Sequence, residues 1–161
     1  MLSGQALSGA SPASCKRNPD GWFTLSVPKE MSEVKRYADV DGGFYLSSDL
    51  ELNFDYWTYE STPNWLRGKY ATNLILACTG KGKRTRTWRT RIDGKPGVIQ
   101  HCSLSNDPNG FRYFYYVTFP KLRVFDGEDF HFGKFNLGIK YRTRSQFSIV
   151  RRIVRSLNFE R

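Results

Sequence analysis

The chain of 161 residues contains few cysteines, few histidines and no long apolar run. Three cysteines are too few for a fold built on disulfide bridges. No stretch approaches the ~20 consecutive apolar residues that a membrane-spanning helix needs, so the sequence predicts no such span. Two histidines, His101 and His131, leave little material for metal binding or for acid–base catalysis.

The sequence also lacks the common catalytic and cofactor signatures. GxGxxG, GxxxxGK[ST], HExxH and GxSxG do not occur. His101 and Cys102 are adjacent on a predicted strand, so their side chains point to opposite faces and cannot form a nucleophile–base pair. Asp55 and Glu60 are a weak candidate carboxylate pair, because the fold would set their separation. We therefore predict that the protein is not an enzyme and binds no cofactor.

One acidic segment is a candidate metal site. Asp126-Gly127-Glu128-Asp129 offers oxygen ligands, and His131 follows it. The segment does not have the D-x-[DN]-x-[DN]-G spacing of a calcium loop, and one histidine does not make a zinc site. We therefore predict a solvated turn here and no metal site.

Charge is abundant but unevenly distributed. The net charge is +10: residues 1–60 carry five Lys or Arg against nine Asp or Glu, a balance of −4, and residues 61–161 carry twenty against six, a balance of +14. This asymmetry favours an acidic partner or surface for the second part. A solvated cationic face that only keeps the protein soluble explains it equally well.

The first nineteen residues are predicted to be a flexible tail, and residues 20–161 a single α+β domain. The tail is rich in Ser, Ala and Gly but has no basic start followed by an apolar run. Either the protein is not exported, or a leader precedes Met1. In an exported protein, whether secreted, periplasmic or membrane-tethered, Cys78 and Cys102 can pair and leave Cys15 on the tail. Three reduced thiols in the cytoplasm are the alternative.

Alternating apolar residues predict an antiparallel sheet. The predicted strands are 22–28, 44–47, 50–57, 84–92, 98–103, 113–119 and 135–141. Residues 30–40 and 120–132 are predicted as connectors, and Asp93–Gly97 as a hairpin turn, because an Asp-Gly pair supplies positive φ values.

Two features predict how the sheet is covered. Tyr113 and Tyr115 face one side of a strand while Phe114 and Tyr116 face the other, so that strand needs cover on both sides. At 100° per residue, the apolar residues of 144–157 fall within an arc of about 120°, which predicts an amphipathic helix. Arginines occupy its opposite side: Arg144, Arg151, Arg152 and Arg155.

The order of elements resembles the Mog/PsbP-like group. The likeness lies in the strand 22–28, the hairpin ending at Tyr56, the turn after Ile92, and the closing helix that ends near Phe159. The resemblance implies an α/β/α sandwich with a central antiparallel sheet of about six or seven strands flanked by helices. Many bacterial secreted proteins and lipoproteins belong to this group, and a non-enzymatic role at a membrane or a larger assembly is implied. A pI near 9.7 is a departure from the group.

One segment is the strongest candidate for a binding site. It is basic and contains a tryptophan: Lys81, Lys83, Arg84, Arg86, Trp88, Arg89 and Arg91. Arginines beside an aromatic ring can hold phosphates and stack a base. However, Arg84 and Arg86 face one side of the predicted strand and Arg89 and Arg91 the other, which does not suit a flat nucleic-acid platform. Cations that protect an edge strand from aggregation explain the segment as well.

The sequence therefore supports two functional hypotheses. The first is an exported, non-catalytic binding or accessory domain that engages an acidic protein, lipid or polyanion through the basic segment and the arginines of the C-terminal helix. The second is a nucleic-acid-binding domain that uses the basic 81–91 segment.

Overall fold

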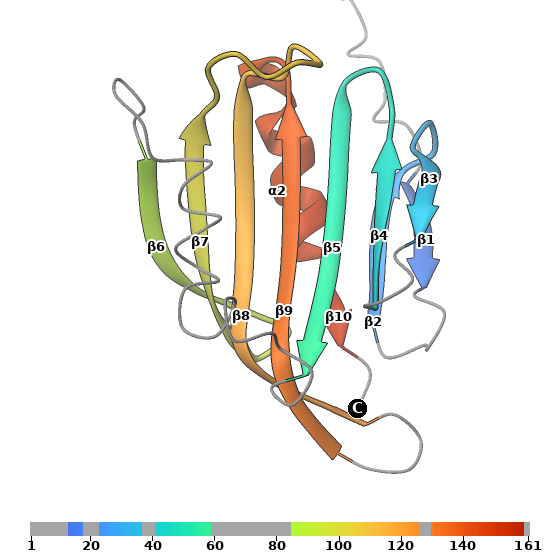
Figure 1. Ribbon diagram of the computed structural model, residues 1–161, viewed down its shortest axis with the longest axis vertical. Helices are drawn as coiled ribbons and strands as arrows, with labels where there is room; N and C mark the ends of the chain where they lie inside the picture. The colour runs from blue at the N-terminus through green and yellow to red at the C-terminus, as the bar shows by residue number, and fades with distance from the viewer. Residues whose placement is uncertain (1–12, 18–22, 37–40, 59–84, 126–129, 160–161) are drawn as a thin grey trace, which may run out of the picture.

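The computed structural model describes residues 13–17, 23–36, 41–58, 85–125 and 130–159. Its main feature is a seven-stranded sheet with the order β3-β4-β5-β9-β8-β7-β6, in which every neighbouring pair is antiparallel (Figure 1). In that order the strands are Ser32–Arg36, Asp41–Leu46, Leu50–Thr58, Phe130–Tyr141, Tyr113–Phe125, Lys95–Ser103 and Thr85–Ile92. The predicted antiparallel sheet of six or seven strands is confirmed.

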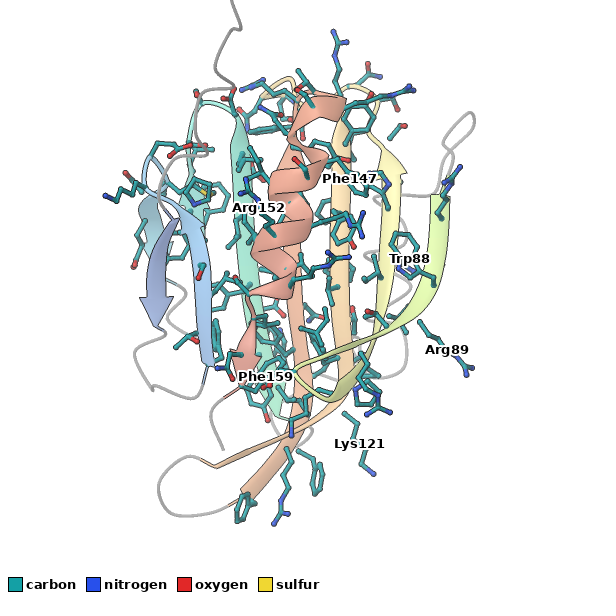
Figure 2. All side chains as sticks on the ribbon, turned by 180° about the vertical axis from the view of Figure 1, so that it is seen from behind. Trp88, Arg89, Lys121, Phe147, Arg152 and Phe159 are labelled. Atoms are coloured by element: carbon teal, nitrogen blue, oxygen red, sulfur yellow. The ribbon has the colours of Figure 1, made fainter. Side chains whose placement is uncertain are left out.

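A second layer lies against one face of this sheet. It contains a short 3₁₀ turn, η1 (Arg144–Gln146), followed by the helix α2 (Phe147–Arg155). Beside the helix lies a three-stranded sheet with the order β1-β2-β10, formed by Ala13–Arg17, Phe23–Pro28 and Asn158–Phe159 (Figures 1 and 2). The predicted amphipathic C-terminal helix is confirmed, and within the described ranges it is the one α-helix.

The main core fills the space between these two layers. Strands β5, β8 and β9 contribute alternate residues to it from the large sheet, and β2 and α2 contribute residues from the second layer. Its most deeply buried members include Leu52, Val117, Phe135, Leu137, Ile139 and Val150. Aromatic rings supply much of the volume, as the composition predicts.

The other face of the sheet is also buried at its centre. Phe114, Tyr116 and Cys102 form a second cluster there, and Leu104 packs against it. Phe114 and Tyr116 alternate along β8 with Tyr115 and Val117 of the main core. The prediction that this strand is covered on both sides is therefore confirmed.

The turn between β6 and β7 is tighter than predicted. Asp93 and Gly94 have φ values of +48° and +72°, as a two-residue hairpin turn requires. Lys95 already pairs with Ile92, so the remainder of the predicted turn belongs to β7. The predicted Asp-Gly turn is confirmed, and the prediction that Lys95–Gly97 belong to the turn is wrong.

Three segments predicted as connectors or tail contain strands. β3 lies within the predicted connector 30–40, and β1 lies within the predicted tail 1–19. Both are polar edge strands, so they lack the apolar alternation that marks a buried strand. β8 and β9 also continue through most of the predicted loop 120–132, because a register shift between Phe119 and Leu122 lets the strand pass Pro120.

Candidate functional site

The structure places the described partner-binding residues on three elements. Four lie on the strand β6: Arg86, Trp88, Arg89 and Arg91. Four lie on η1 and α2: Arg144, Arg151, Arg152 and Arg155. Lys81, Lys83, Arg84 and Cys78 lie outside the described residues. All eight described side chains are exposed, and Trp88 is 38% exposed.

β6 is an edge strand of the large sheet. Its eight residues pair with β7 in one uninterrupted antiparallel register, from Thr85 opposite Cys102 to Ile92 opposite Lys95. Among the described strands, none pairs with its outer edge. Arg86, Thr87, Trp88 and Arg89 are consecutive and all exposed. Within the described part of the chain, β6 therefore presents these exposed side chains at an edge of the sheet where no further strand is paired.

The arginines of β6 lie on both faces of the sheet, as predicted. Arg86 and Trp88 lie on the face that carries α2, where the Trp88 ring meets the Tyr115 ring edge-on at 5.9 Å. Arg89 and Arg91 alternate to the opposite face. Figure 2 shows Trp88 beside the helix layer and Arg89 extending beyond the sheet edge.

Aromatic side chains connect β6 to the helix. The His101 ring of β7 stacks on the Phe147 ring of α2 with centroids 5.1 Å apart. Tyr115 lies between them and Trp88, 5.7 Å from His101 and 5.8 Å from Phe147. The Arg151 guanidinium lies 5.8 Å from the Phe147 ring centroid. Arg86 of the strand and Arg151 of the helix thus border one row of aromatic rings on the helix-bearing face.

Electrostatics confirm that these arginines are close to the rings. Burial lowers the pKa of His101, and the nearby Arg86 guanidinium lowers it further. Burial raises the pKa of Tyr115, while Arg151 and Arg155 act in the opposite direction. Arg86, from one element, and Arg151 and Arg155, from another, therefore act on neighbouring rings.

His101 has a structural role in this arrangement. Its Nε2 atom and the Tyr141 hydroxyl oxygen are 2.6 Å apart. Burial raises the pKa of Tyr141, as do Tyr113 and Tyr115, so Tyr141 keeps its proton. Both partners are neutral near pH 7, and the hydrogen bond joins β7 to β9. His101 and Cys102 lie on opposite faces, as predicted.

The described elements that carry the arginines contain little negative charge. The strands β6 and β7, together with η1 and α2, contain no Asp or Glu. The one acid in the β6–β7 turn, Asp93, accepts a hydrogen bond from the Phe159 backbone N–H at 2.8 Å. Arg91 donates to the Gly94 carbonyl oxygen at 2.7 Å and remains exposed. Within these described elements, the arginines therefore have no acidic residue of their own element beside them, which favours a positive potential there.

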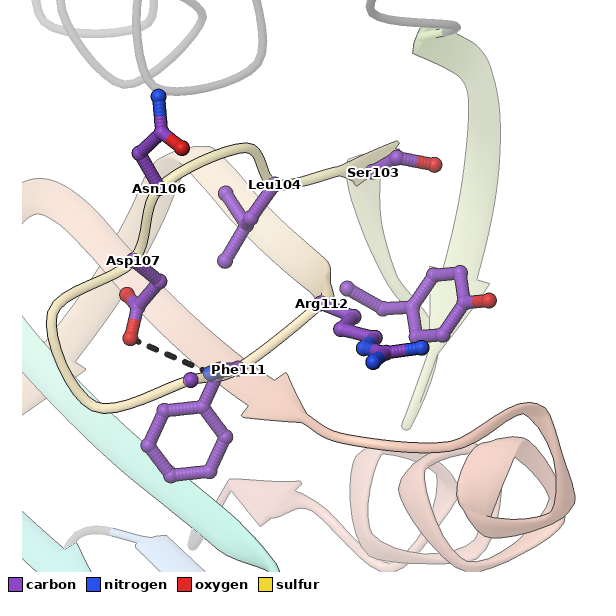
Figure 3. A pocket seen from close by; sticks show the side chains of 8 residues that line it. Ser103, Leu104, Asn106, Asp107, Phe111 and Arg112 are labelled. Atoms are coloured by element: carbon purple, nitrogen blue, oxygen red, sulfur yellow. Dashed lines mark hydrogen bonds between the residues drawn. The ribbon is translucent and has the colours of Figure 1, made fainter.

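Two hollows lie beside the loop that joins β7 to β8. The first, of about 470 Å³, is shown in Figure 3. Its lining is Ser103, Leu104, Asn106, Asp107, Gly110, Phe111, Arg112 and Tyr113. The second, of about 580 Å³, lies next to Arg142 and Glu51.

The charged groups of these hollows hold the loop in place. Lys140 Nζ lies 3.0 Å from Glu51 Oε1 and 3.0 Å from Asp107 Oδ2. Burial raises the pKa of Asp107, but hydrogen bonds from Lys140 and from the backbone of Asn109 and Phe111 outweigh it and hold the pKa below its ordinary value. These carboxylates already have partners, so we do not place the functional site here.

Arg142 also stabilises the loop that joins β7 to β8. Its side chain donates to the Ser48 and Asn109 carbonyl oxygens at 2.7 Å and lies over the Phe111 ring at 4.5 Å. Sequence reasoning missed Arg142 and Lys140, because no local pattern shows which distant loops their side chains reach.

The remaining sequence candidates are only partly within the described structure. Asp55 accepts a hydrogen bond from Asn136 Nδ2 at 2.6 Å, whereas Glu60 lies outside the described residues, as does the acidic segment Asp126–Asp129. Cys102 is disulfide-bonded, but pairing with Cys78 stays a prediction.

The described residues hold no group of three or more metal-ligating side chains. Within the same ranges no helix combines the length and apolar character required to cross a bilayer.

Comparison with known proteins identifies the fold. No protein-family model and no curated protein matches the chain. The solution structure of cyanobacterial PsbP (CyanoP) from Synechocystis sp. PCC 6803 matches with a TM-score of 0.54 and 12% identity, covering 98% of both chains.

Two further solved structures are similar. A crystal structure from Bacteroides thetaiotaomicron VPI-5482 has a TM-score of 0.52 and 10% identity. The match covers 91% of this chain and 48% of the Bacteroides chain. The Ran-binding protein Mog1p of Saccharomyces cerevisiae has a TM-score of 0.47 and 11% identity, covering 93% of this chain and 96% of that one. The chain thus has the Mog/PsbP-like fold, in agreement with the resemblance seen in the sequence.

Proposed function

We propose that this protein is a non-catalytic, exported binding or accessory domain that engages an acidic partner protein. The single observation that carries the proposal is the exposed arginine set on β6 and α2, in elements without Asp or Glu. Its contact surface consists of Arg86, Trp88, Arg89, Arg91, Arg151 and Arg155, and we call it the arginine surface. Clustered charge of one sign steers a partner of opposite charge and fixes its orientation.

The other sites support a binding role over catalysis. His101 is hydrogen-bonded to the Tyr141 hydroxyl and stacked against Phe147, and Asp107 is hydrogen-bonded to Lys140, so structural contacts engage both side chains. The Mog/PsbP-like fold carries no residue pattern that assigns a reaction to this chain.

The disulfide at Cys102 supports export, because such bonds persist mainly in oxidising compartments. We expect Cys78 to be its partner, which leaves the Cys15 thiol available. A thiol titration of the denatured, non-reduced protein should then find one reactive thiol, located at Cys15 by peptide mapping. Labelling of Cys78 in that experiment contradicts the assignment.

A charge-reversal experiment tests the binding proposal. The double variant Arg89→Glu, Arg91→Glu changes the net charge by the same amount as the control Lys29→Glu, Arg112→Glu, whose exposed side chains lie outside the arginine surface. With poly-glutamate as the acidic probe at ~0.15 M salt, where the Debye length is about 8 Å, we expect a tenfold or greater loss for the first variant only. Equal losses would mean that net charge alone drives binding.

The helix requires its own variant. Arg151→Glu, Arg155→Glu should weaken poly-glutamate binding if α2 contributes, since both guanidinium groups lie near Tyr115. Arg152 and Arg155 also lie in the last helical turn, where cations stabilise the helix dipole. A thermal melt of each variant therefore has to separate lost binding from lost stability.

Single-stranded nucleic acid is the second candidate partner. The observation that favours it is Trp88, 38% exposed and on the same face as Arg86, because a base can stack on the ring while the guanidinium meets a phosphate. For a dT20 oligonucleotide, log K should fall linearly with log salt, with a slope of about −0.7 for each phosphate contacted. The absence of measurable binding at ~0.15 M salt excludes this candidate.

A further inference from the structure

We infer that the acidic partner binds as an extended segment that adds to β6 as an eighth strand of the large sheet. This inference rests on the proposed function, because it takes an acidic protein as the partner. It adds the mode of binding, in which the backbone edge of β6 supplies hydrogen bonds and its arginines supply specificity.

The two edges of the sheet differ in how well they suit an added strand. β3, at one edge, has five residues and a register shift between Glu33 and Lys35. Bulges of this kind twist an edge away from new partners. β6, at the other edge, has eight residues, no proline and no register shift. Within the described sheet, β6 is therefore the edge that can template a regular strand.

The placement of the arginines suits a strand better than it suits a flat ligand. Arg86 lies on the helix-bearing face, and Arg89 and Arg91 lie on the opposite face. A membrane or a stacked nucleic acid meets one face of a sheet edge, whereas an added strand sends side chains to both. Residues directly opposite each other on paired strands have Cβ atoms ~4.5–5.5 Å apart, close enough for each arginine to meet a carboxylate.

The register predicts the spacing of acids in the partner. An antiparallel segment that places acids opposite Arg91, Arg89 and Arg86 reads acid-x-acid-x-x-acid in its own direction. A parallel segment reads the same spacing reversed. The positions between face Thr87, Trp88 and Thr90, for which β-branched or aromatic residues make favourable cross-strand pairs.

The arginines also exclude wrong partners. Cations on an edge strand discourage pairing with neutral or basic strands, which is how natural sheets avoid aggregation. An acidic segment removes that repulsion, so one set of charges can both protect β6 and select its ligand. Edge protection and strand addition therefore differ in one respect: only strand addition depends on the order of acids in the ligand.

Synthetic peptides of about twelve residues provide the test. The first carries Glu-Val-Glu-Thr-Val-Glu at its centre and the second the reversed order Glu-Val-Thr-Glu-Val-Glu. The third has the same composition with its three acids adjacent, and the fourth is the tighter binder of the first two with alternate amides N-methylated. Titration calorimetry gives each affinity. We expect one spaced peptide to bind at least about tenfold tighter than the adjacent-acid peptide, and N-methylation to remove this advantage.

A charge-swap variant controls for general electrostatics. Arg89→Glu should weaken the better spaced peptide, and a peptide with Lys at the position opposite residue 89 should bind the variant better than it binds the native protein. If all acidic peptides bind equally well, strand addition is wrong while acidic-partner binding stands. If none binds, and poly-glutamate does not bind either, both proposals are wrong.

Discussion

Phe135 lies where the layers of the protein meet, so its removal tests whether they share one core. Its side chain is fully buried. Its ring comes from β9 and lies 5.1 Å from the Phe23 ring of β2, 5.5 Å from the Phe159 ring of β10 and 6.0 Å from the Phe119 ring of β8. The large sheet and the small sheet are therefore joined through this residue.

The size of the effect follows from burial and ring contacts. Phe135→Ala should lower the free energy of unfolding by about 3–5 kcal/mol, as buried Phe→Ala changes do. Phe135→Leu loses the ring contacts but retains part of the apolar volume, so we expect a smaller loss than for Phe135→Ala. Because domains have only ~5–15 kcal/mol of stability, the alanine variant should be visibly compromised.

Urea denaturation followed by circular dichroism measures both variants. With an m value of about 2 kcal/mol/M, Phe135→Ala should lower the midpoint by roughly 2 M. Val34→Ala is the control, since Val34 is 58% exposed on β3 and its loss should cost less than about 0.5 kcal/mol. A loss below about 1 kcal/mol for Phe135→Ala would show that the two layers do not depend on a common core.

Three further predictions concern the site and its supports. Arg86→Gln should raise the pKa of His101, because the guanidinium lowers it; an NMR titration of the imidazole measures this, and an unchanged pKa contradicts their proximity. Asp107 has a pKa below its ordinary value of 3.8, so it contributes stability above that value that is lost as the pH falls through its folded pKa. Asp107→Asn should therefore flatten the acid limb of a stability–pH curve, and an identical limb refutes the role of Lys140. Gly138→Ala should cost about 1–3 kcal/mol, because an added Cβ meets side chains of both neighbouring strands; a stability equal to the native protein shows that those side chains can move.

Much of the fold could be predicted because its signals are local. The Asp93-Gly94 pair has the positive φ values that its sequence predicts. Rings at both Phe114 and Tyr115 required cover on two faces of one strand, and both are buried. The period of the apolar residues in 144–157 identified the helix α2.

Other features depend on partners distant in the sequence. Ser32–Arg36 has no apolar alternation, since an edge strand need bury little, and only its pairing with β4 reveals it. The sequence located the arginines of β6 and of α2 separately. The convergence of Trp88 and Arg151 on the rings of Tyr115 and Phe147 arises from tertiary contacts across roughly sixty residues, which no periodicity encodes.

Backbone NMR of the labelled protein during titration with the better spaced acidic peptide tests the central claim most directly. We predict that the largest shift changes fall on the amides of residues 86–91, and that some of these amides gain protection from hydrogen exchange as they acquire strand partners. Changes confined to the loop around Asp107, or a β6 whose amides neither shift nor gain protection, would contradict the assignment of β6 as the binding edge.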